Sequence, residues 1–360
     1  MMRAALALAR RSLGRTWPNP AVGCIIVRDG HVVGRGRTQE GGRPHAEVVA
    51  LAQAGEAARG ATVYVTLEPC SHFGKSPPCA DALVHAGVAR VVSAMEDPYP
   101  AVNGRGHARL RQAGIAVEVG EGAEEATEIN AGFLMHVRIG RPLVHVKLAT
   151  SIDGRIATAT GESKWITGEV ARARGHRLRM MYDAILIGIG TAIADDPELT
   201  CRLPGLSAYS PVRVVLDSQA RLSPDSRLAR TATARPVWLL CTPEAPGSRR
   251  APLAAMGVEV IEVPADCNGH VDVLAAAFAL GKYGVTRLLV EGGGEVAAAF
   301  LAANLVDRLS VFRGGRLLGG DSRSAVAALG LEKLDFAPRF TLVSSRTVAG
   351  DTLESWTRAT

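Results

Sequence analysis

The sequence predicts an α/β protein of two domains, and three observations lead to this fold class. The chain has 360 residues, enough for about two domains of roughly 100–200 residues each. Apolar strand-like runs alternate with helical apolar spacing, which favours a mostly parallel sheet covered by helices. This alternation begins again after Gly140-Arg141-Pro142, so we expect domains over residues 1–140 and 141–360.

The elements of the first domain follow from local signals. Residues 1–15 predict an amphipathic helix rather than a signal peptide, because the apolar core is short and no small-residue cleavage site follows. Residues 23–36 predict two strands joined by an Asp-Gly turn. We then expect a helix over 45–58, a strand over 61–67, a helix over 77–87 that prolines open and Gly87 closes, and a strand over 88–95.

The second domain repeats this order with longer apolar runs. Its predicted strands cover 143–151, 183–190, 212–217, 237–241, 258–263 and 287–293, and its predicted helices cover 168–181, 271–282 and 294–304. Two of the strand-to-helix junctions carry glycines, 187–202 (IGIGTAIADDPELTCR) and 290–296 (VEGGGEV). Free N–H groups at such junctions can hold a phosphate, although three consecutive glycines such as Gly292-Gly293-Gly294 more often form a tight turn. Neither junction has the spacing of a Rossmann fingerprint.

Composition excludes several classes of protein. The contents of 47% apolar and 21% charged residues are those of an ordinary globular protein, and the longest apolar run, 296–306, is shorter than the ~18 residues of a membrane span. Six thinly spread cysteines argue against a disulfide framework. We therefore expect a cytoplasmic protein that makes no membrane contact.

The basic balance does not predict a nucleic-acid partner. The formal net charge is +6, but the 41 basic residues are scattered and include only five lysines. Aromatic residues make up 4% of the chain, too few for the stacking platforms of single-strand binders. An enzyme that acts on a small phosphorylated substrate accounts for the same charge.

Two short stretches of the first domain predict a catalytic zinc site. His45, Cys70 and Cys79 supply three ligands, which leaves the fourth position for water. Glu47, two residues beyond His45, is placed to move a proton at that water. A histidine and glutamate in H-x-E, followed by Pro-Cys, form the signature of zinc deaminases, which release ammonia from an amidine-like ring carbon. A structural zinc site is the alternative, and His72 is then the candidate fourth ligand.

The spacing of the two cysteines narrows the substrate. Eight residues (SHFGKSPP) separate Cys70 from Cys79, where nucleic-acid deaminases have two. Together with WPNPAVGCIIV, PHAEVVAL and DPYPAVNGRG, this stretch resembles the deaminase half of the bifunctional deaminase/reductases of riboflavin biosynthesis. The resemblance implies a cytidine-deaminase-like three-layer domain and a diaminopyrimidinone substrate that carries a ribosyl 5-phosphate. It implies that Asn19, His72 and Lys75 contact this substrate.

The second domain resembles the reductase half of the same family. The similar stretches are 147–168, 190–202, 215–222 and 289–301. The resemblance implies a dihydrofolate-reductase-like fold in which NADPH reduces the ribosyl group to a ribityl chain. It implies NADPH contacts from Ala149, Trp165, Thr191, Asp195, Ser218, Gly293, Gly294 and Glu295, and substrate contacts from Ser163, Arg179, Leu199, Arg202 and Glu291. Arg179 and Arg202 suit forked phosphate contacts, and Asp195 and Glu291 are candidates for assisting ring opening.

Two positions depart from the family pattern. Thr38 stands where relatives often have a histidine, and Arg313-Gly314-Gly315 brings charge and flexibility into a predicted strand. The leading hypothesis is a bifunctional, zinc- and NADPH-dependent enzyme, which we expect to form a homo-oligomer. The alternatives are a nucleic-acid or nucleoside zinc deaminase with a basic accessory domain, and a zinc-stapled scaffold without activity.

Overall fold

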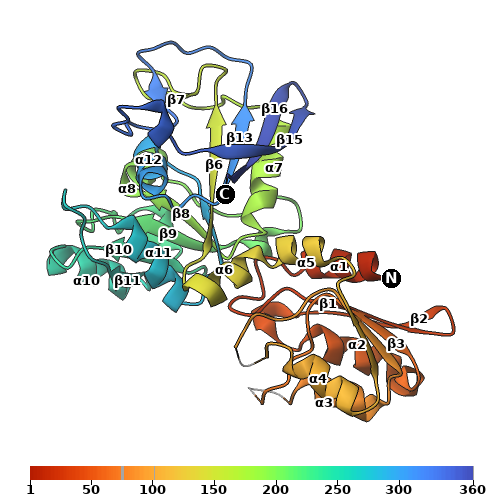
Figure 1. The fold of residues 1–360 in the computed structure, drawn as a ribbon. Coiled ribbons are helices and arrows are strands. Elements are labelled where there is room, and N and C mark those ends of the chain that lie inside the picture. Colours follow the sequence, from red (N-terminus) through yellow and green to blue (C-terminus); the bar gives the residue numbers. More distant parts are fainter. Residues whose placement is uncertain (74–76, 101, 360) are drawn as a thin grey trace. The chain divides into compact units, whose positions relative to one another are not determined.

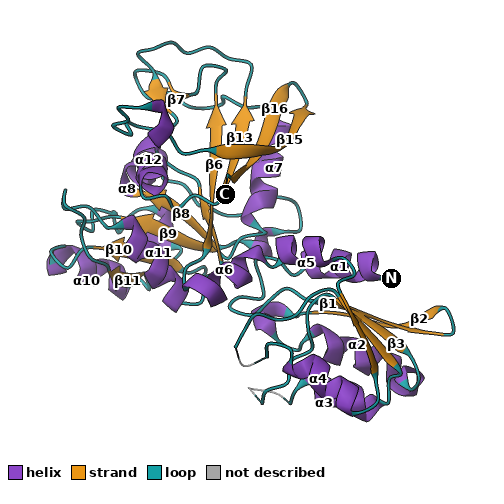
Figure 2. Cartoon of the chain, viewed as in Figure 1, coloured by secondary structure: helices purple, strands orange, loops and turns teal. Residues whose placement is uncertain are grey.

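The computed structural model describes residues 1–73, 77–100 and 102–359, and the chain divides into two compact units (Figure 1). Unit 1 comprises Met1–Gly140 and unit 2 comprises Arg141–Thr360. Each unit contains one large β-sheet with helices packed against it (Figure 2). Within the described ranges, every helix is too short or too polar to cross a bilayer.

Unit 1 is built on a five-stranded sheet of order β2-β1-β3-β4-β5. Strands β1 and β2 form an antiparallel hairpin, β1 pairs antiparallel with β3, and β3, β4 and β5 are parallel. The elements are α1 (Met2–Arg10), β1 (Gly23–Arg28), β2 (His31–Arg37), α2 (Ala46–Ala54), β3 (Thr62–Val65), α3 (Cys79–Ala86), β4 (Arg90–Ser93), α4 (Arg105–Gln112), β5 (Ala116–Val119), α5 (Ala123–Ile129) and α6 (Ala131–Ile139). Short 3-10 turns cover Glu40–Gly42 and Gly55–Ala58.

Close helix packing makes unit 1 a three-layer domain. A Cβ on Gly23 of β1 would lie 1.9 Å from the carbonyl oxygen of Ala5 in α1, so only glycine lets this helix approach. On the next strand, a Cβ on Gly36 would lie 1.9 Å from the carbonyl oxygen of Ala46 in α2. Helices α1 and α2 therefore cover opposite faces of the sheet, and α5 joins α1 while α3 joins α2 (Figure 1).

The predicted elements of unit 1 are present. The strands of the 23–36 hairpin meet at Asp29-Gly30, and both residues have the positive φ angles that a two-residue type I′ turn requires. The helix expected over 45–58 ends at Ala54 and continues as a 3-10 turn. Gly87 closes α3 in the left-handed conformation, as its position predicts.

Unit 2 carries a nine-stranded sheet of order β11-β10-β9-β8-β12-β6-β13-β16-β15 and a two-stranded sheet of β7 and β14. All neighbours from β11 to β13 are parallel, and β16 and β15 add an antiparallel end. The elements are β6 (Leu143–Thr150), β7 (Arg155–Ala157), α7 (Glu169–Arg179), β8 (Ala184–Gly188), α8 (Ile189–Asp195), β9 (Val212–Leu216), α9 (Arg227–Arg230), β10 (Val237–Cys241), α10 (Gly247–Ala255), β11 (Glu259–Glu262), α11 (Val273–Lys282), β12 (Arg287–Val290), α12 (Gly294–Ala302), β13 (Arg308–Arg313), β14 (Arg323–Ser324), β15 (Phe340–Val348) and β16 (Asp351–Arg358), with 3-10 turns at Ser207–Tyr209 and Leu334–Phe336.

Alternating side chains of the central strands build the core of unit 2. Ile185 and Ile187 of β8 pack in one cluster with Leu239 of β10, Leu228 of α9 and Leu253 of α10. Because side chains of a strand alternate between faces, the intervening residues of β8 serve the opposite face, and all five of its residues are buried. Continuous apolar runs are typical of parallel strands covered on both sides.

Two expectations for unit 2 need correction. The strand expected over 183–190 ends at Gly188, where α8 begins, because Ile187 and Ile189 extend the apolar run across the junction and hide its end. Gly314 and Gly315 lie beyond β13 rather than inside a strand. A Cβ on Gly314 would lie 2.1 Å from the carbonyl oxygen of Ile166, which explains the glycine there. Arg313 ends β13, and its guanidinium lies 3.3 Å from the Glu354 carboxylate.

Candidate functional site

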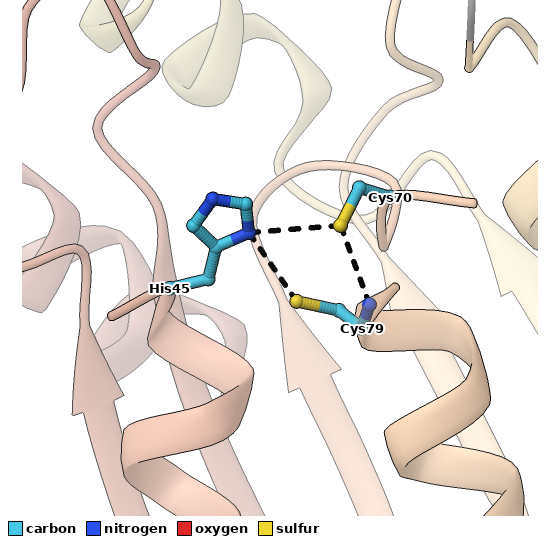
Figure 3. Close-up of side chains that lie close together, drawn as sticks. All are labelled: His45, Cys70 and Cys79. Carbon is cyan, nitrogen blue, oxygen red and sulfur yellow. Dashed lines mark hydrogen bonds between the residues drawn. The ribbon is translucent and has the colours of Figure 1, made fainter. Parts of the chain in front are cut away.

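The fold brings His45, Cys70 and Cys79 together in unit 1 (Figure 3). His45 precedes the first residue of α2, Cys70 follows β3, and Cys79 begins α3. His45 Nδ1 lies 3.6 Å from Cys70 Sγ and 3.3 Å from Cys79 Sγ. A tetrahedral zinc separates a nitrogen from a sulfur ligand by about 3.6 Å, so the three side chains fit this ion.

The electrostatics at Cys70 also suit a metal. Hydrogen bonds from Cys79 and His45 to the Cys70 sulfur lower the pKa of this thiol to about 4. The backbone N–H of Cys79 donates to the same sulfur at 3.3 Å. The hydrogen bond to Cys70, together with burial, raises the pKa of the Cys79 thiol. Thiolates are the form in which cysteine binds zinc.

Glu47 lies on the first turn of α2, close to the three candidate ligands. Its side chain is buried, and burial together with the negative Cys70 raises the pKa of its carboxyl to about 7. His45 precedes the helix with an extended backbone, whereas Glu47 lies within the first turn, so the two residues belong to different local structures. The structure thus holds a carboxylate beside the metal position and separate from the candidate ligands.

A cavity of about 550 Å³ opens beside this cluster. Its walls include His45, Glu47 and Cys70, together with the predicted substrate residues Asn19 and His72 and the divergent Thr38. Asn19 packs under the 3-10 turn of Glu40–Gly42, since a Cβ on Gly42 would lie 2.1 Å from its amide nitrogen. His72 is exposed, and its ring centroid lies 5.9 Å from that of Tyr99. Lys75 falls outside the described residues.

Thr38 has a local explanation in the structure. Its hydroxyl accepts the backbone N–H of Val22 at 3.0 Å, and its own backbone N–H donates to the Val22 carbonyl. Thr38 therefore secures the segment between α1 and β1 against the end of β2. At this position the cavity wall has a hydroxyl that is already hydrogen-bonded.

Sequence reasoning missed several residues of the cavity wall. They are Arg43, Glu68, Asp97, Tyr99, Phe133 and His136. Asp97 and Tyr99 lie in the DPYPAVNGRG stretch, Glu68 precedes the Pro-Cys of the signature, and Arg43 directly precedes PHAEVVAL, so attention to the neighbours of the motif residues finds these four. Phe133 and His136 come from α6, which no motif marks.

Unit 2 gathers several predicted cofactor residues at one edge of its sheet. Strands β9, β8, β12 and β6 are adjacent and parallel, so their carboxyl ends meet there. Ser218 follows β9, Thr191 lies in α8 after β8, Gly293 precedes α12 after β12, and Ala149 is near the end of β6. In open α/β sheets this edge is where ligands bind.

The start of α12 suits a phosphate group. Gly293 has φ of +60°, and a Cβ there would lie 3.2 Å from the Thr191 hydroxyl oxygen, so glycine permits this approach. Gly294 and Glu295 form the first turn of the nine-residue helix, whose first N–H groups have no partner within it. These residues fit the pyrophosphate of a dinucleotide cofactor.

A buried ion cluster lies at the same edge of unit 2. The Arg179 guanidinium holds the Glu291 carboxylate through two hydrogen bonds of 2.8 and 2.9 Å, and Lys147 Nζ lies 3.5 Å from the same carboxylate. Burial opposes ionisation of Glu291, but Arg179 and Lys147 outweigh it and hold its pKa at about 2. Glu291 is thus ionised at neutral pH and is not a proton donor there. Arg179 was expected to bind a phosphate group, but its guanidinium already pairs with this carboxylate.

The other predicted substrate and cofactor residues lie on surrounding loops. Trp165 is exposed, and the Arg172 guanidinium stacks 4.4 Å from its ring centroid. Arg202 is exposed beside His176, Asp195 is exposed at the end of α8, and Leu199 is buried with positive φ. Ser163 is half-buried in the loop before Trp165. The Ser218 hydroxyl accepts the N–H of Val271 at 2.9 Å.

Comparisons with known proteins find matches to both units. The model of the cytidine and deoxycytidylate deaminase zinc-binding region matches residues 1–95, and the model of the RibD C-terminal domain matches 142–353. The riboflavin biosynthesis protein RibD of Escherichia coli is 46% identical over 97% of this chain and 96% of its own length. That of Bacillus amyloliquefaciens is 40% identical over 94% and 90%.

Solved structures agree with these matches over nearly the whole chain. Acinetobacter baumannii RibD, form 2, has a TM-score of 0.88 at 38% identity and covers 99% of this chain and 98% of its own. A diaminohydroxyphosphoribosylaminopyrimidine deaminase/5-amino-6-(5-phosphoribosylamino)uracil reductase from Thermotoga maritima has a TM-score of 0.86 at 34% identity, with coverage of 99% and 97%. The predicted fold class is confirmed: a cytidine-deaminase-like unit is followed by a reductase unit.

Proposed function

The chain belongs to the family of the bifunctional riboflavin-biosynthesis protein RibD, and on that premise we propose which unit performs each of its two reactions. It is a zinc-dependent pyrimidine deaminase and an NADPH-dependent reductase, as predicted, and the alternative of a nucleic-acid deaminase is not favoured. We assign deamination to residues 1–140 and reduction to residues 141–360. The observation that carries the assignment is the cluster of His45, Cys70 and Cys79 with Glu47 in the cavity of unit 1.

In the deamination, His45, Cys70 and Cys79 hold the zinc and Glu47 moves the proton. Bound zinc supplies a water of lowered pKa. The substrate is 2,5-diamino-6-(5-phosphoribosylamino)pyrimidin-4-one, with its ring in the cavity and Asn19 and His72 beside it. The Glu47 carboxylate accepts a proton of the attacking water and delivers it to the exocyclic nitrogen that leaves as ammonia. Because Glu47 is buried, this proton is shielded from bulk solvent.

In the reduction, unit 2 aligns NADPH with the ribosyl group. NADPH supplies the hydride that converts the ribosyl carbon C1′ into a ribityl carbon. The first turn of α12, with Gly293 and Thr191 beside it, binds the pyrophosphate, and Ala149, Trp165, Asp195 and Ser218 contact the rest of the cofactor. Ser163, Leu199 and Arg202 contact the substrate. Arg179 and Glu291 fix each other's orientation at the same edge.

Removal of the metal separates the two reactions. Treatment with a zinc chelator is expected to abolish ammonia release, because the three ligands then hold no ion. NADPH oxidation on substrate that has already been deaminated is expected to continue, because among the described residues of unit 2 no cluster of three metal-ligating side chains is found. Added zinc is expected to restore ammonia release. Loss of both activities in chelated protein whose unit 2 stays folded contradicts this assignment.

We further propose that the enzyme is a cytoplasmic homo-oligomer. Its zinc thiols and its NADPH supply both require a reducing compartment. The partner surface is formed by exposed apolar residues of edge strand β15 and the segment before it: Leu331, Leu334, Phe336, Leu342 and Val343. Edge strands with exposed apolar residues readily pair with another chain. Sedimentation is expected to show an oligomer in the wild type that Leu334→Lys with Phe336→Lys dissociates, and a monomeric wild type contradicts the proposal.

A further inference from the structure

Glu68 is a buried carboxylate to which the deamination chemistry assigns no task. It follows β3, precedes the candidate ligand Cys70 by two residues, and is 3% exposed. Its Oε2 accepts the backbone N–H groups of Asp97 and Gly104 at 3.1 and 2.9 Å. Its Oε1 accepts those of Gly106 and His107 at 2.8 and 3.2 Å. One side chain thus binds four backbone groups that lie 29 to 39 residues further along the chain.

These four hydrogen bonds decide what Glu68 can do. A carboxylate offers about four lone-pair positions, and here the backbone uses all of them. Two of the donors, Gly106 and His107, belong to the first turn of α4, where N–H groups have no helical partner and the helix dipole favours a negative charge. Glu68 therefore has no free acceptor for substrate, although it lies in the cavity wall.

Close backbone packing reinforces the same contact. A Cβ on Gly106 would lie 2.0 Å from the carbonyl oxygen of Pro69 and 3.1 Å from Oε1 of Glu68. The start of α4 therefore lies directly against the segment that carries Cys70, and only glycine permits this distance. The backbone N–H of Glu68 also donates to the Met95 carbonyl at 3.0 Å, which ties the same segment to the end of β4.

The segment that Glu68 holds forms a wall of the cavity. Asp97, Tyr99, Pro100 and Val102 line the cavity in which the substrate is proposed to bind. Tyr99 also meets His72, which comes from the segment between the two cysteines. Glu68 therefore connects this wall to the metal position through the chain that leads to Cys70.

We propose that Glu68 is a positioning residue of the deaminase, which sets the loop after β4 at a fixed place relative to Cys70 and thereby shapes the pyrimidine subsite. The inference rests on the proposed assignment of deamination to the cavity of unit 1. It differs from a purely structural role, in which Glu68 stabilises unit 1 as a whole. A positioning role acts on substrate binding, whereas a structural role acts on the amount of folded, zinc-loaded enzyme.

The test is Glu68→Gln in the full-length, zinc-loaded enzyme, with the phosphoribosylated diaminopyrimidinone as substrate. Glutamine has the same shape but turns an amide NH₂ toward two backbone N–H groups, so one arm of the clamp is lost. Because hydrogen bonds to a charged group are the strong ones, we expect KM for ammonia release to rise about tenfold or more. Zinc content and NADPH oxidation on deaminated substrate stay at wild-type values, and kcat changes less than KM.

Two further variants make the test specific. Glu56→Gln changes an exposed carboxylate in the turn that continues α2, and its KM is expected to stay unchanged. Gly106→Ala must move α4 away from Pro69 without altering the charge of Glu68, so its KM is expected to rise as well. If Glu68→Gln does not fold, KM of Gly106→Ala alone tests the positioning role.

The outcomes separate this inference from the assignment on which it rests. The positioning role is overturned if KM for ammonia release is unchanged in zinc-loaded Glu68→Gln and Gly106→Ala. It is also overturned if these variants lose activity only in proportion to a loss of bound zinc. Ammonia release by Glu47→Gln at the wild-type rate overturns the assignment of the cavity instead. Hydrogen exchange provides a direct readout, since the amides of Asp97, Gly104, Gly106 and His107 are expected to exchange faster in Glu68→Gln while those of β4 do not.

Discussion

Glu47→Gln is expected to lower the rate of ammonia release about a thousandfold or more, while NADPH oxidation on deaminated substrate keeps its wild-type rate. Glutamine fills the same buried space on the first turn of α2 but cannot accept and return a proton. Proton transfer by a positioned side chain contributes about 10² to 10⁴-fold to a rate, which sets the size of the loss. The three candidate ligands remain, so zinc content is expected to stay at the wild-type value.

The measurement is ammonia release by purified variants whose zinc content has been determined. Glu56→Gln is a matched control, because Glu56 is an exposed carboxylate in the turn that continues α2, and no loss is expected there. If Glu47→Gln loses both ammonia release and NADPH oxidation while it is folded and zinc-loaded, the two sites are not independent. If it loses neither, the zinc site of unit 1 is a structural one.

Glu291→Gln is expected to abolish NADPH oxidation and to destabilise unit 2 by about 3–5 kcal/mol, the usual cost of breaking a buried ion pair. Glu291 is the common partner of Arg179 and Lys147, whose side chains are 15% and 19% exposed. Its removal leaves two cations close together in a largely buried place. Ammonia release from unit 1 is expected to continue at the wild-type rate.

The loss of stability in Glu291→Gln is expected to depend on pH. The pKa of Glu291 is lowered from an ordinary 4.5 to about 2 in the folded protein, so unfolding leads to uptake of a proton below pH 4.5. The stabilisation is fully present above that pH and is lost as the pH falls toward 2. The difference in free energy of unfolding between wild type and variant therefore shrinks over this interval.

Thermal unfolding of both proteins at several pH values measures this effect. Glu198→Gln is a suitable control, since it breaks a carboxylate–arginine pair with Arg227 that is 45% and 56% exposed and contributes little. Two results contradict the account of the buried cluster. One is an equal loss of stability in the two variants; the other is a loss of stability in Glu291→Gln that does not change with pH.

The sequence predicted those parts of the structure that local signals determine. Local sequence determines the helix end at Gly87, the turn at Asp29-Gly30 and the apolar parallel strands, and these elements are present. Strands β15 and β16 were not predicted. Most residues of β15 are exposed, so no regular burial pattern marks it as a strand. Such strands form because a partner strand is available, which is a tertiary condition.

The site was predictable to the extent that motifs carry it. His45, Glu47, Cys70 and Cys79 belong to one signature, and the structure brings them to one place. The pairing of Arg179 with Glu291 spans 112 residues, and no local pattern indicates it. Glu68 likewise reads as part of the signature before Cys70, whereas its four hydrogen bonds depend on how α4 packs. Long-range polar contacts of this kind are decided by the fold.

The order of the two reactions provides the most direct test of a deaminase in unit 1 followed by a reductase in unit 2. Wild-type enzyme is supplied with the phosphoribosylated diaminopyrimidinone, first without and then with NADPH, and ammonia and NADP are followed separately. We predict that ammonia is released without NADPH, and that NADPH added later is oxidised in proportion to the ammonia already formed. Oxidation of NADPH before any ammonia appears, or ammonia release only when NADPH is present, contradicts this account.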